Sequence, residues 1–241
     1  MKKRWISGLA AAVLCIALAG CGDSSQPQRG TITPAKTQQT DPAATETTTV
    51  TDGSVSLGRI VGGSYENTYA GYGCKLDENW QYYTAEELQD LSELTQELLE
   101  DSKLAEQTGS YAQITDMMAE NAQSLQSMNV LYTRLSFQER LLYSNMSEEA
   151  LIDTTLKQKD VLLETYAQAG MDVSSIEKVQ VSFLGEEHYA IRTTAKVQGV
   201  DYYILQLFDF NLGGQYYVTL TMSSFEEDTT SELLDLFYPV E

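Results

Sequence analysis

Residues 179–222, VQVSFLGEEHYAIRTTAKVQGVDYYILQLFDFNLGGQYYVTLTM, decide the fold of this chain. Within them lie four stretches in which apolar side chains either alternate with polar ones, as in a half-buried β-strand, or follow one another, as in a buried strand. These stretches are residues 179–183, 189–197, 200–210 and 215–222. Short turn-forming segments separate them, at Gly185-Glu186-Glu187, at Gln198-Gly199 and at residues 211–214. Connections this short join antiparallel neighbours, so the pattern predicts a four-stranded meander.

The third of these strands is apolar on both of its faces. Tyr202, Ile204 and Phe208 alternate with Tyr203, Leu205 and Leu207. A strand of this kind lies between two covering layers. The sequence therefore predicts an α+β fold, in which helices pack on both faces of an antiparallel sheet.

Working outward from the meander, the same periodicities predict two further strands and four helices. The strands are residues 69–76 and 129–137, and the helices begin at Thr84 or span residues 111–125, 147–170 and 229–237. Thr84 with Glu87, and Thr229 with Glu232, form the T-x-x-E pattern of a capping box. Ser147 suits the N-cap of the third helix and Gly170 its C-terminal end.

The element order and several short motifs resemble the PsbP-like domain of small clostridial-type lipoproteins. The motifs are Tyr65-Glu66-Asn67, Tyr69, Gly71, Trp80, Glu86-Glu87-Leu88, Ser224-Phe225 and Leu233-Leu234-Asp235-Leu236-Phe237. The resemblance covers residues 65–241 and implies an antiparallel sheet sandwiched by helices. Because the motifs are packing and turn features, no functional residue is carried over with them.

The N-terminus has the three parts of a secretory signal peptide, predicted over residues 1–20. Lys2, Lys3 and Arg4 are followed by an uncharged apolar run, residues 5–18. The run ends in Leu18-Ala19-Gly20-Cys21, which resembles a complete lipobox. We therefore expect diacylglycerol on the Cys21 thiol, and a protein held on the outer face of the cell membrane by its lipid chains.

Residues 21–64 are predicted to be the lipidated cysteine and a disordered tether, and residues 65–241 one globular domain. The tether is rich in Ser, Thr, Gln and Pro, and it carries too few apolar side chains to offset the entropy of ordering. A glycosylated stalk is the alternative interpretation of its Ser and Thr content.

Net charge excludes one class of partner. The chain carries −20, and loss of three of its 15 basic residues with the signal peptide leaves 12 against 35 acidic ones. Such a surface repels phosphate backbones, so no nucleic acid is expected to bind. It also repels anionic lipids, so the lipid on Cys21 is expected to supply the membrane attachment.

No motif predicts catalysis, a cofactor or a resident metal. His188 is the only histidine, and its strand phase, opposite to that of Tyr189, predicts a solvent-facing side chain. Asp209, Asn211 and the run Glu226-Glu227-Asp228 are interpreted as structural or solvated polar side chains, with weak Ca²⁺ binding as the alternative. Neither group completes an EF-hand loop.

The remaining candidates are a thiol and four tyrosines. Cys15 leaves with the signal peptide and Cys21 is lipidated, so Cys74 has no cysteine to pair with and is predicted to be a buried core thiol. Four tyrosines lie near the ends of predicted elements, where they could stack on a sugar or a peptide. They are Tyr82, Tyr83, Tyr216 and Tyr217.

The function that these observations favour is a non-enzymatic envelope lipoprotein that binds another protein. A lipoprotein that binds a small ligand, a peptide or peptidoglycan is the first alternative. A hydrolase that uses carboxylates is the second, because burial can tune the pKa of a carboxylate toward neutrality.

Overall fold

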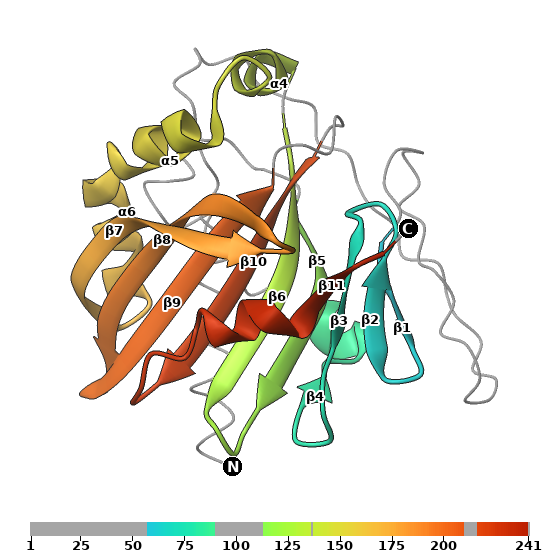
Figure 1. Ribbon diagram of the computed structural model, residues 1–241. Helices are drawn as coiled ribbons and strands as arrows, with labels where there is room; N and C mark the ends of the chain where they lie inside the picture. The colour runs from blue at the N-terminus through green and yellow to red at the C-terminus, as the bar shows by residue number, and fades with distance from the viewer. Residues whose placement is uncertain (1–56, 90–112, 136, 210–215, 241) are drawn as a thin grey trace.

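The computed structural model describes residues 57–89, 113–135, 137–209 and 216–240 (Figure 1). These residues form an α+β fold with two antiparallel sheets, as the sequence predicts for the class. The predicted signal peptide and lipobox, and the predicted tether as far as residue 56, lie outside them.

The larger sheet has seven strands and contains the predicted meander as four consecutive neighbours. Its order is β4 (Gln81–Tyr82), β5 (Gln113–Asn121), β6 (Gln126–Arg134), β10 (Tyr216–Phe225), β9 (Val200–Asp209), β8 (Glu186–Val197) and β7 (Met171–Phe183). The first meander turn is Leu184-Gly185, one residue earlier than predicted, and the second is Gln198-Gly199 as predicted. All four turn residues have positive φ angles, the conformation that matches a two-residue hairpin to the twist of its strands.

The predicted helix over residues 111–125 is wrong, because its described part is strand β5 and the turn that follows it. This strand pairs with β6 from Gln113 opposite Thr133 to Asn121 opposite Gln126. Met117 and Met118 are both buried since the two faces of the strand are both covered. A short apolar run buried on both faces has the same side-chain pattern as a buried helix, and only its pairing with β6 distinguishes the two.

The smaller sheet has the order β1 (Arg59–Val61), β2 (Ser64–Asn67), β3 (Tyr72–Lys75) and β11 (Phe237–Pro239). The predicted strand 69–76 is therefore shorter, because Gly71 turns the chain with a φ of +77°. At Gly73 a β-carbon would lie 2.7 Å from both the Tyr65 carbonyl oxygen and the Tyr238 ring. Glycine at this position lets β2, β3 and β11 approach one another closely.

The last predicted helix, 229–237, is also wrong in length and in its cap. Only a 3₁₀ helix, η1 (Glu232–Leu236), forms before β11, and no side chain caps it. The Thr229 hydroxyl instead accepts a hydrogen bond from Gln126 Nε2 at 2.7 Å, so it serves β6 rather than a capping box.

Three helices connect β6 to β7: α4 (Phe137–Tyr143), α5 (Glu148–Leu156) and α6 (Lys159–Gln168). The predicted strand 129–137 thus ends at Arg134, and the predicted helix 147–170 is two helices. Ser147 is confirmed as an N-cap, since its hydroxyl accepts from the Ala150 amide at 3.2 Å. Gly170 follows the end of α6 with a φ of +77°, as its predicted role requires.

The predicted capping box at Thr84 is confirmed in its geometry. Glu87 accepts from the Thr84 amide at 2.9 Å, and Thr84 Oγ1 accepts from the Glu87 amide at 3.3 Å. Residues 85–89 are helical, and the remainder of that predicted helix lies outside the described residues.

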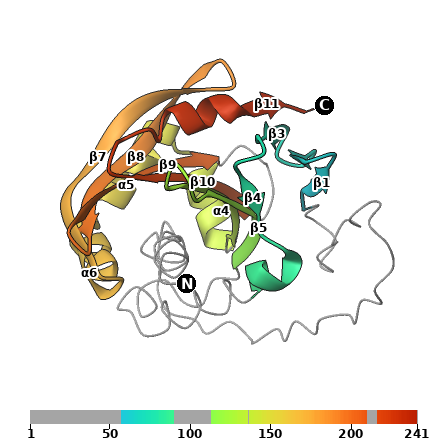
Figure 2. The ribbon, with the colours of Figure 1, turned by 90° about the horizontal axis from the view of Figure 1, so that it is seen from below.

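The seven-stranded sheet separates two cores (Figure 2). On one face, side chains of α5 and α6 such as Ile152, Leu162 and Tyr166 pack on the sheet. On the other face, the described covering is the small sheet with η1, which contribute Tyr72 and Phe237 among others. Among the described residues no helix is both long and apolar enough to cross a membrane.

Candidate functional site

A β-bulge in β5 places one carboxylate between the two sheets. The register with β6 shifts between Thr115 and Met117, which leaves Asp116 without a partner in the ladder. A bulge re-aims the side chain of the extra residue. Asp116 consequently faces the small sheet, where its Oδ2 accepts from the Tyr65 hydroxyl at 2.6 Å and from Asn67 Nδ2 at 2.7 Å.

The same carboxylate holds the first described residues of the chain. The Gly58 amide lies 2.9 Å from Asp116 Oδ1 and 3.0 Å from Oδ2. A β-carbon on Gly58 would come within 2.2 Å of the Tyr65 ring, so glycine permits this approach. Asp116 thus ties residue 58, near the start of the described residues, to a strand of the large sheet.

Two further tyrosines complete what we call the Asp116 cluster: Tyr65, Asn67, Tyr72, Asp116 and Tyr132. Asn67 Nδ2 also donates to the Tyr132 hydroxyl at 2.7 Å. The Tyr72 hydroxyl is buried and has no hydrogen-bond partner in the described part of the chain. The cluster therefore contains three hydroxyls, of which only two are hydrogen-bonded.

Burial dominates the electrostatics of the cluster. It raises the pKa of Asp116, and the hydrogen bonds from Tyr65, Gly58 and Asn67 offset part of that rise. Burial, followed by the nearby Asp116 charge, raises the pKa of Tyr65 well above its ordinary value. Both carboxylate oxygens accept from groups of the chain itself, so the geometry supports a structural tie rather than a general base positioned on a substrate.

The sequence did not single out Asp116. It lies inside the stretch predicted as a helix, where a polar residue next to Met117 is read as solvent-facing. The signal that could have found it was a single Asp among apolar residues, in a stretch whose pattern fits a buried strand as well as a helix.

His188 is not freely exposed, contrary to its predicted solvent-facing position. Its Nδ1 lies 3.0 Å from Glu148 Oε1, its ring packs edge-on against Phe183, and its side chain is 23% exposed. The contact joins β8 to the first turn of α5. His188 therefore has a structural role, because its contact with Glu148 links strand β8 to helix α5.

The structure does not bring the candidate Ca²⁺ ligands among the described residues together into a binding site. Asp228 lies 3.5 Å from Arg192 Nε and accepts from the Thr230 hydroxyl at 2.7 Å, while Glu226 and Glu227 are exposed. Asn211 lies outside the described residues. Across the described ranges, no three His, Cys, Asp or Glu side chains converge as metal ligands would.

Cys74 is confirmed as a buried thiol. Its side chain is inaccessible to solvent in the core between the two sheets, and its Sγ lies 3.6 Å from Met128 Sδ. Burial raises its pKa to about 12. Both effects suppress the thiolate, which is the reactive form.

We expect Cys74 in the native protein to resist a thiol reagent at neutral pH and to react once denaturant is added. The reason is that the reagent needs access and a thiolate, and the fold removes both. The measurement is the time course of labelling with a chromogenic disulfide, read with and without denaturant. Rapid labelling of the native protein would show that the core between the sheets opens.

The four tyrosines near element ends do not form an aromatic surface together. Tyr216 and Tyr217 are buried, on opposite faces of β10. The Tyr82 hydroxyl donates to the Cys74 carbonyl at 3.1 Å, and that of Tyr83 to Glu120 at 3.1 Å. Their hydroxyls serve the fold, and the sugar-stacking alternative finds no support in their placement.

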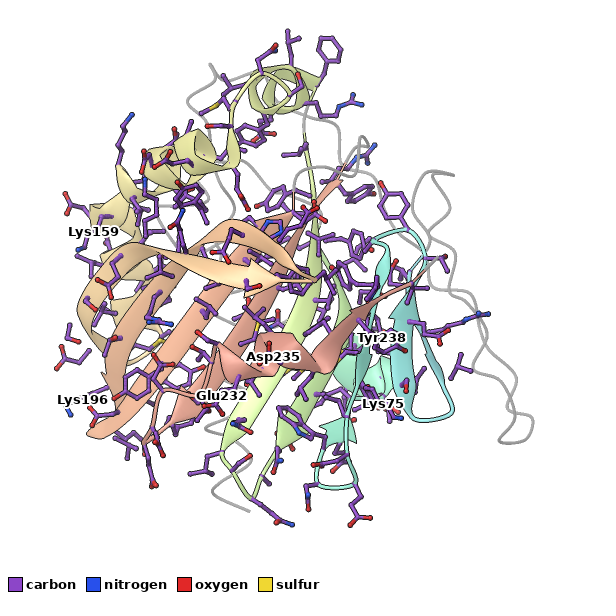
Figure 3. The ribbon with its side chains drawn as sticks, viewed as in Figure 1. Lys75, Lys159, Lys196, Glu232, Asp235 and Tyr238 are labelled. Carbon is purple, nitrogen blue, oxygen red and sulfur yellow. The ribbon has the colours of Figure 1, made fainter. Side chains whose placement is uncertain are left out.

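Strand β7 presents a long unpaired edge of the seven-stranded sheet. In the described part of the chain it pairs with β8 alone, over residues Met171 to Phe183. Phe183 and Glu186 flank a two-residue turn, and residues in that position exchange backbone hydrogen bonds with each other. Along β7, residues that bond to β8 alternate with residues whose N–H and C=O point away from β8, toward the outer edge of the sheet. The outward-pointing residues are Ile176, Lys178, Gln180 and Ser182. The Ile176 carbonyl is consistent with this outward direction, since it accepts a hydrogen bond from Lys159 Nζ at 3.4 Å. Lys159 lies at the start of α6 (Figure 3).

Helix α4 carries the second exposed feature. Phe137, Leu141 and Leu142 are 72%, 61% and 45% exposed, and the first two are one helical turn apart. Arg140 lies over the Phe137 ring with 5.7 Å between its guanidinium carbon and the ring centroid. Three large apolar side chains on one short helix form a patch that differs from scattered surface residues.

Comparison with known proteins assigns no family. No protein-family model matches the sequence, and no curated protein matches it either.

Proposed function

We propose that this protein is a lipoprotein anchored on the outer face of the cell membrane through lipid on Cys21, and that its domain binds another protein without catalysing a reaction. The lipobox sequence supports the anchor. The observation that carries the binding role is the outer edge of β7, which pairs with no other strand among the described residues.

The free backbone N–H and C=O groups of a strand edge determine what kind of partner can bind there. From residue 175 to Phe183 the strand is regular, and four residues aim both N–H and C=O away from β8. Such groups are matched in register only by another extended polypeptide, which adds to the sheet as a further strand. Soluble proteins blunt such edges with bulges and charges. Here the bulge lies between Val173 and Ser175, Glu177 is exposed, and the Ile176 carbonyl accepts from Lys159. The outward backbone groups of Lys178, Gln180 and Ser182 remain for a partner strand.

The test is photocrosslinking on intact cells from a photoreactive amino acid placed at Ser182, with Gln123 in the β5–β6 turn as the control position. Both side chains are exposed, but only Ser182 lies on the edge strand. We expect a defined crosslinked product from Ser182 and none from Gln123, because strand addition places partner atoms beside β7.

A second substitution tests the backbone itself. Gln180→Pro removes an N–H that points outward, and so leaves the β7–β8 ladder intact. It should abolish the Ser182 product, whereas Gln180→Ala should preserve it. Persistence of the product in the proline variant would contradict strand addition. A product with the mass of two copies would assign the edge to self-association instead.

The PsbP-like arrangement, with helices on both faces of the sheet, remains part of this proposal. It is supported by the four-strand meander, whereas the helical turn that starts at Thr84 packs through Leu88 on Met118, on the face that α5 and α6 also cover. It predicts that a helix covers the sheet on the side of the small sheet as well, which an experimental structure of the whole chain would test.

A further inference from the structure

The exposed apolar side chains on α4 would be stabilised by contact with an apolar surface. Phe137, Leu141 and Leu142 project from a helix of seven residues that follows the end of β6. Leaving three such side chains in water forfeits the free energy of burying them. Neither the core nor the proposed strand addition at β7 uses them.

The charges next to this patch are positive, although the protein is strongly acidic. Arg140 stacks on Phe137, and Arg134, at the end of β6, is exposed. The acidic residue within α4, Glu139, is buried. Further along the chain, Glu148 lies against His188, and Glu149 is bound by Lys178 at 2.9 Å. An apolar face fringed by arginine complements a surface that is apolar beneath and anionic at its boundary.

The exposed acidic turn after β10 lies at the opposite end of the sheet from α4, whereas Glu186 and Glu187, which are also exposed, lie in register at the same end as Arg134. The exposed residues Glu226 and Glu227 follow Phe225, and β10 pairs with β6 so that Ser224 is opposite Gln126 and Tyr216 is opposite Arg134. Strand β6 runs from Gln126 to Arg134, so α4 is at the far end from the turn with Glu226 and Glu227 (Figure 1). A surface approached by α4 would meet little of that acidic charge.

The expected lipid anchor brings such a surface within reach. Cys21 and Leu57 are 36 positions apart in the sequence. If the segment between them is the flexible tether that the sequence predicts, a segment of that length would span about 33 Å on average, comparable to the size of the domain. Gly58 is fixed to Asp116 beside Tyr65 and Asn67, and Asn67 contacts Tyr132 in the half of β6 that leads into α4. The chain from the anchor therefore joins the domain in the half nearer α4.

We propose that the α4 face, comprising Phe137, Arg140, Leu141 and Leu142, is a second membrane contact that rests in the interface of an anionic bilayer. This inference rests on the proposed anchoring at Cys21 and adds an orientation to it. Tethering raises the local concentration of the patch at the lipid surface, so a weak contact suffices. The edge of β7 is a separate feature and remains available for a protein.

The experiment uses the lipidated full-length mature protein on vesicles of phosphatidylglycerol mixed with phosphatidylcholine brominated along one acyl chain. Bromine quenches tryptophan that lies near it. Two variants are compared, Phe137→Trp on α4 and Val200→Trp at the start of β9, where the side chain is 40% exposed and lies at the end of the sheet remote from α4. Trp80 is common to both proteins and supplies the same background.

We expect stronger quenching of the Phe137→Trp protein than of the Val200→Trp protein, because an interfacial helix sinks about 5–10 Å into the boundary of headgroups and acyl chains. Replacing phosphatidylglycerol with neutral lipid, or Arg140 with Gln, should reduce the difference. Equal quenching of the two variants on vesicles that they still bind would overturn the membrane contact and leave α4 to a protein partner. Failure of both proteins to float with the vesicles would instead refute the anchor.

Discussion

Replacing Cys21 with alanine should remove all fatty acid from this protein. The thiol is the only atom in the lipobox that accepts diacylglycerol, so the change is expected to be complete. Two acyl chains bury enough CH₂ groups for stable attachment, at about 0.8 kcal/mol each. The measurement is incorporation of a labelled fatty acid in cells, together with partitioning into the detergent phase.

The matched control is Cys74→Ala, which removes the other cysteine of the expected mature chain. Cys74 is buried in the core, so this variant should incorporate label like the parent. Label retained by the Cys21→Ala protein would refute the lipobox interpretation. Label lost from both variants would point to failed export or folding, and the control separates these cases.

Removing one hydroxyl from each of two neighbouring tyrosines should change stability in opposite directions. Tyr65→Phe deletes the donor that lies 2.6 Å from Asp116, and we expect a loss of about 2 kcal/mol in the free energy of unfolding. Tyr72→Phe deletes a buried hydroxyl with no partner among the described residues, and we expect a gain of up to about 1 kcal/mol.

Both variants keep the aromatic ring, so packing is matched and the hydroxyl alone is tested. In the protein the Tyr72 ring lies edge-on to both Phe183 and Phe237, with 5.8 Å between the ring centroids of each pair. The measurement is denaturant unfolding of each protein, followed by fluorescence or circular dichroism. A loss of equal size in both variants would contradict the described geometry of the Asp116 cluster.

The meander could be predicted from the sequence because its information is local. Alternation through residues 179–222 sets which side chains share a face, and two-residue turns leave antiparallel pairing as the only short connection. The caps at Thr84 and Ser147 could be predicted for the same reason, since each involves residues within one helical turn. Burial of Cys74 follows from its phase with Tyr72.

The errors fall where distant residues compete for the same atoms. Thr229 carries a capping pattern, yet its hydroxyl bonds to Gln126, about a hundred positions away, and the helix does not extend. His188 has the phase of an exposed residue, yet Glu148 of α5 covers it. In both cases a tertiary contact replaces the interaction that local spacing favours.

By itself the sequence determined the α+β class, the four-strand meander, the helix caps at Thr84 and Ser147 and the burial of Cys74, because each depends on side chains a few residues apart. Only the tertiary structure decided that residues 113–121 form a strand and that Asp116 is half-buried beside Tyr65. An apolar run with one acid is compatible with a helix or a strand, and pairing with β6 excludes the helix. The bulge then turns Asp116 toward donors from Gly58, Tyr65 and Asn67, which lie about fifty positions earlier in the chain.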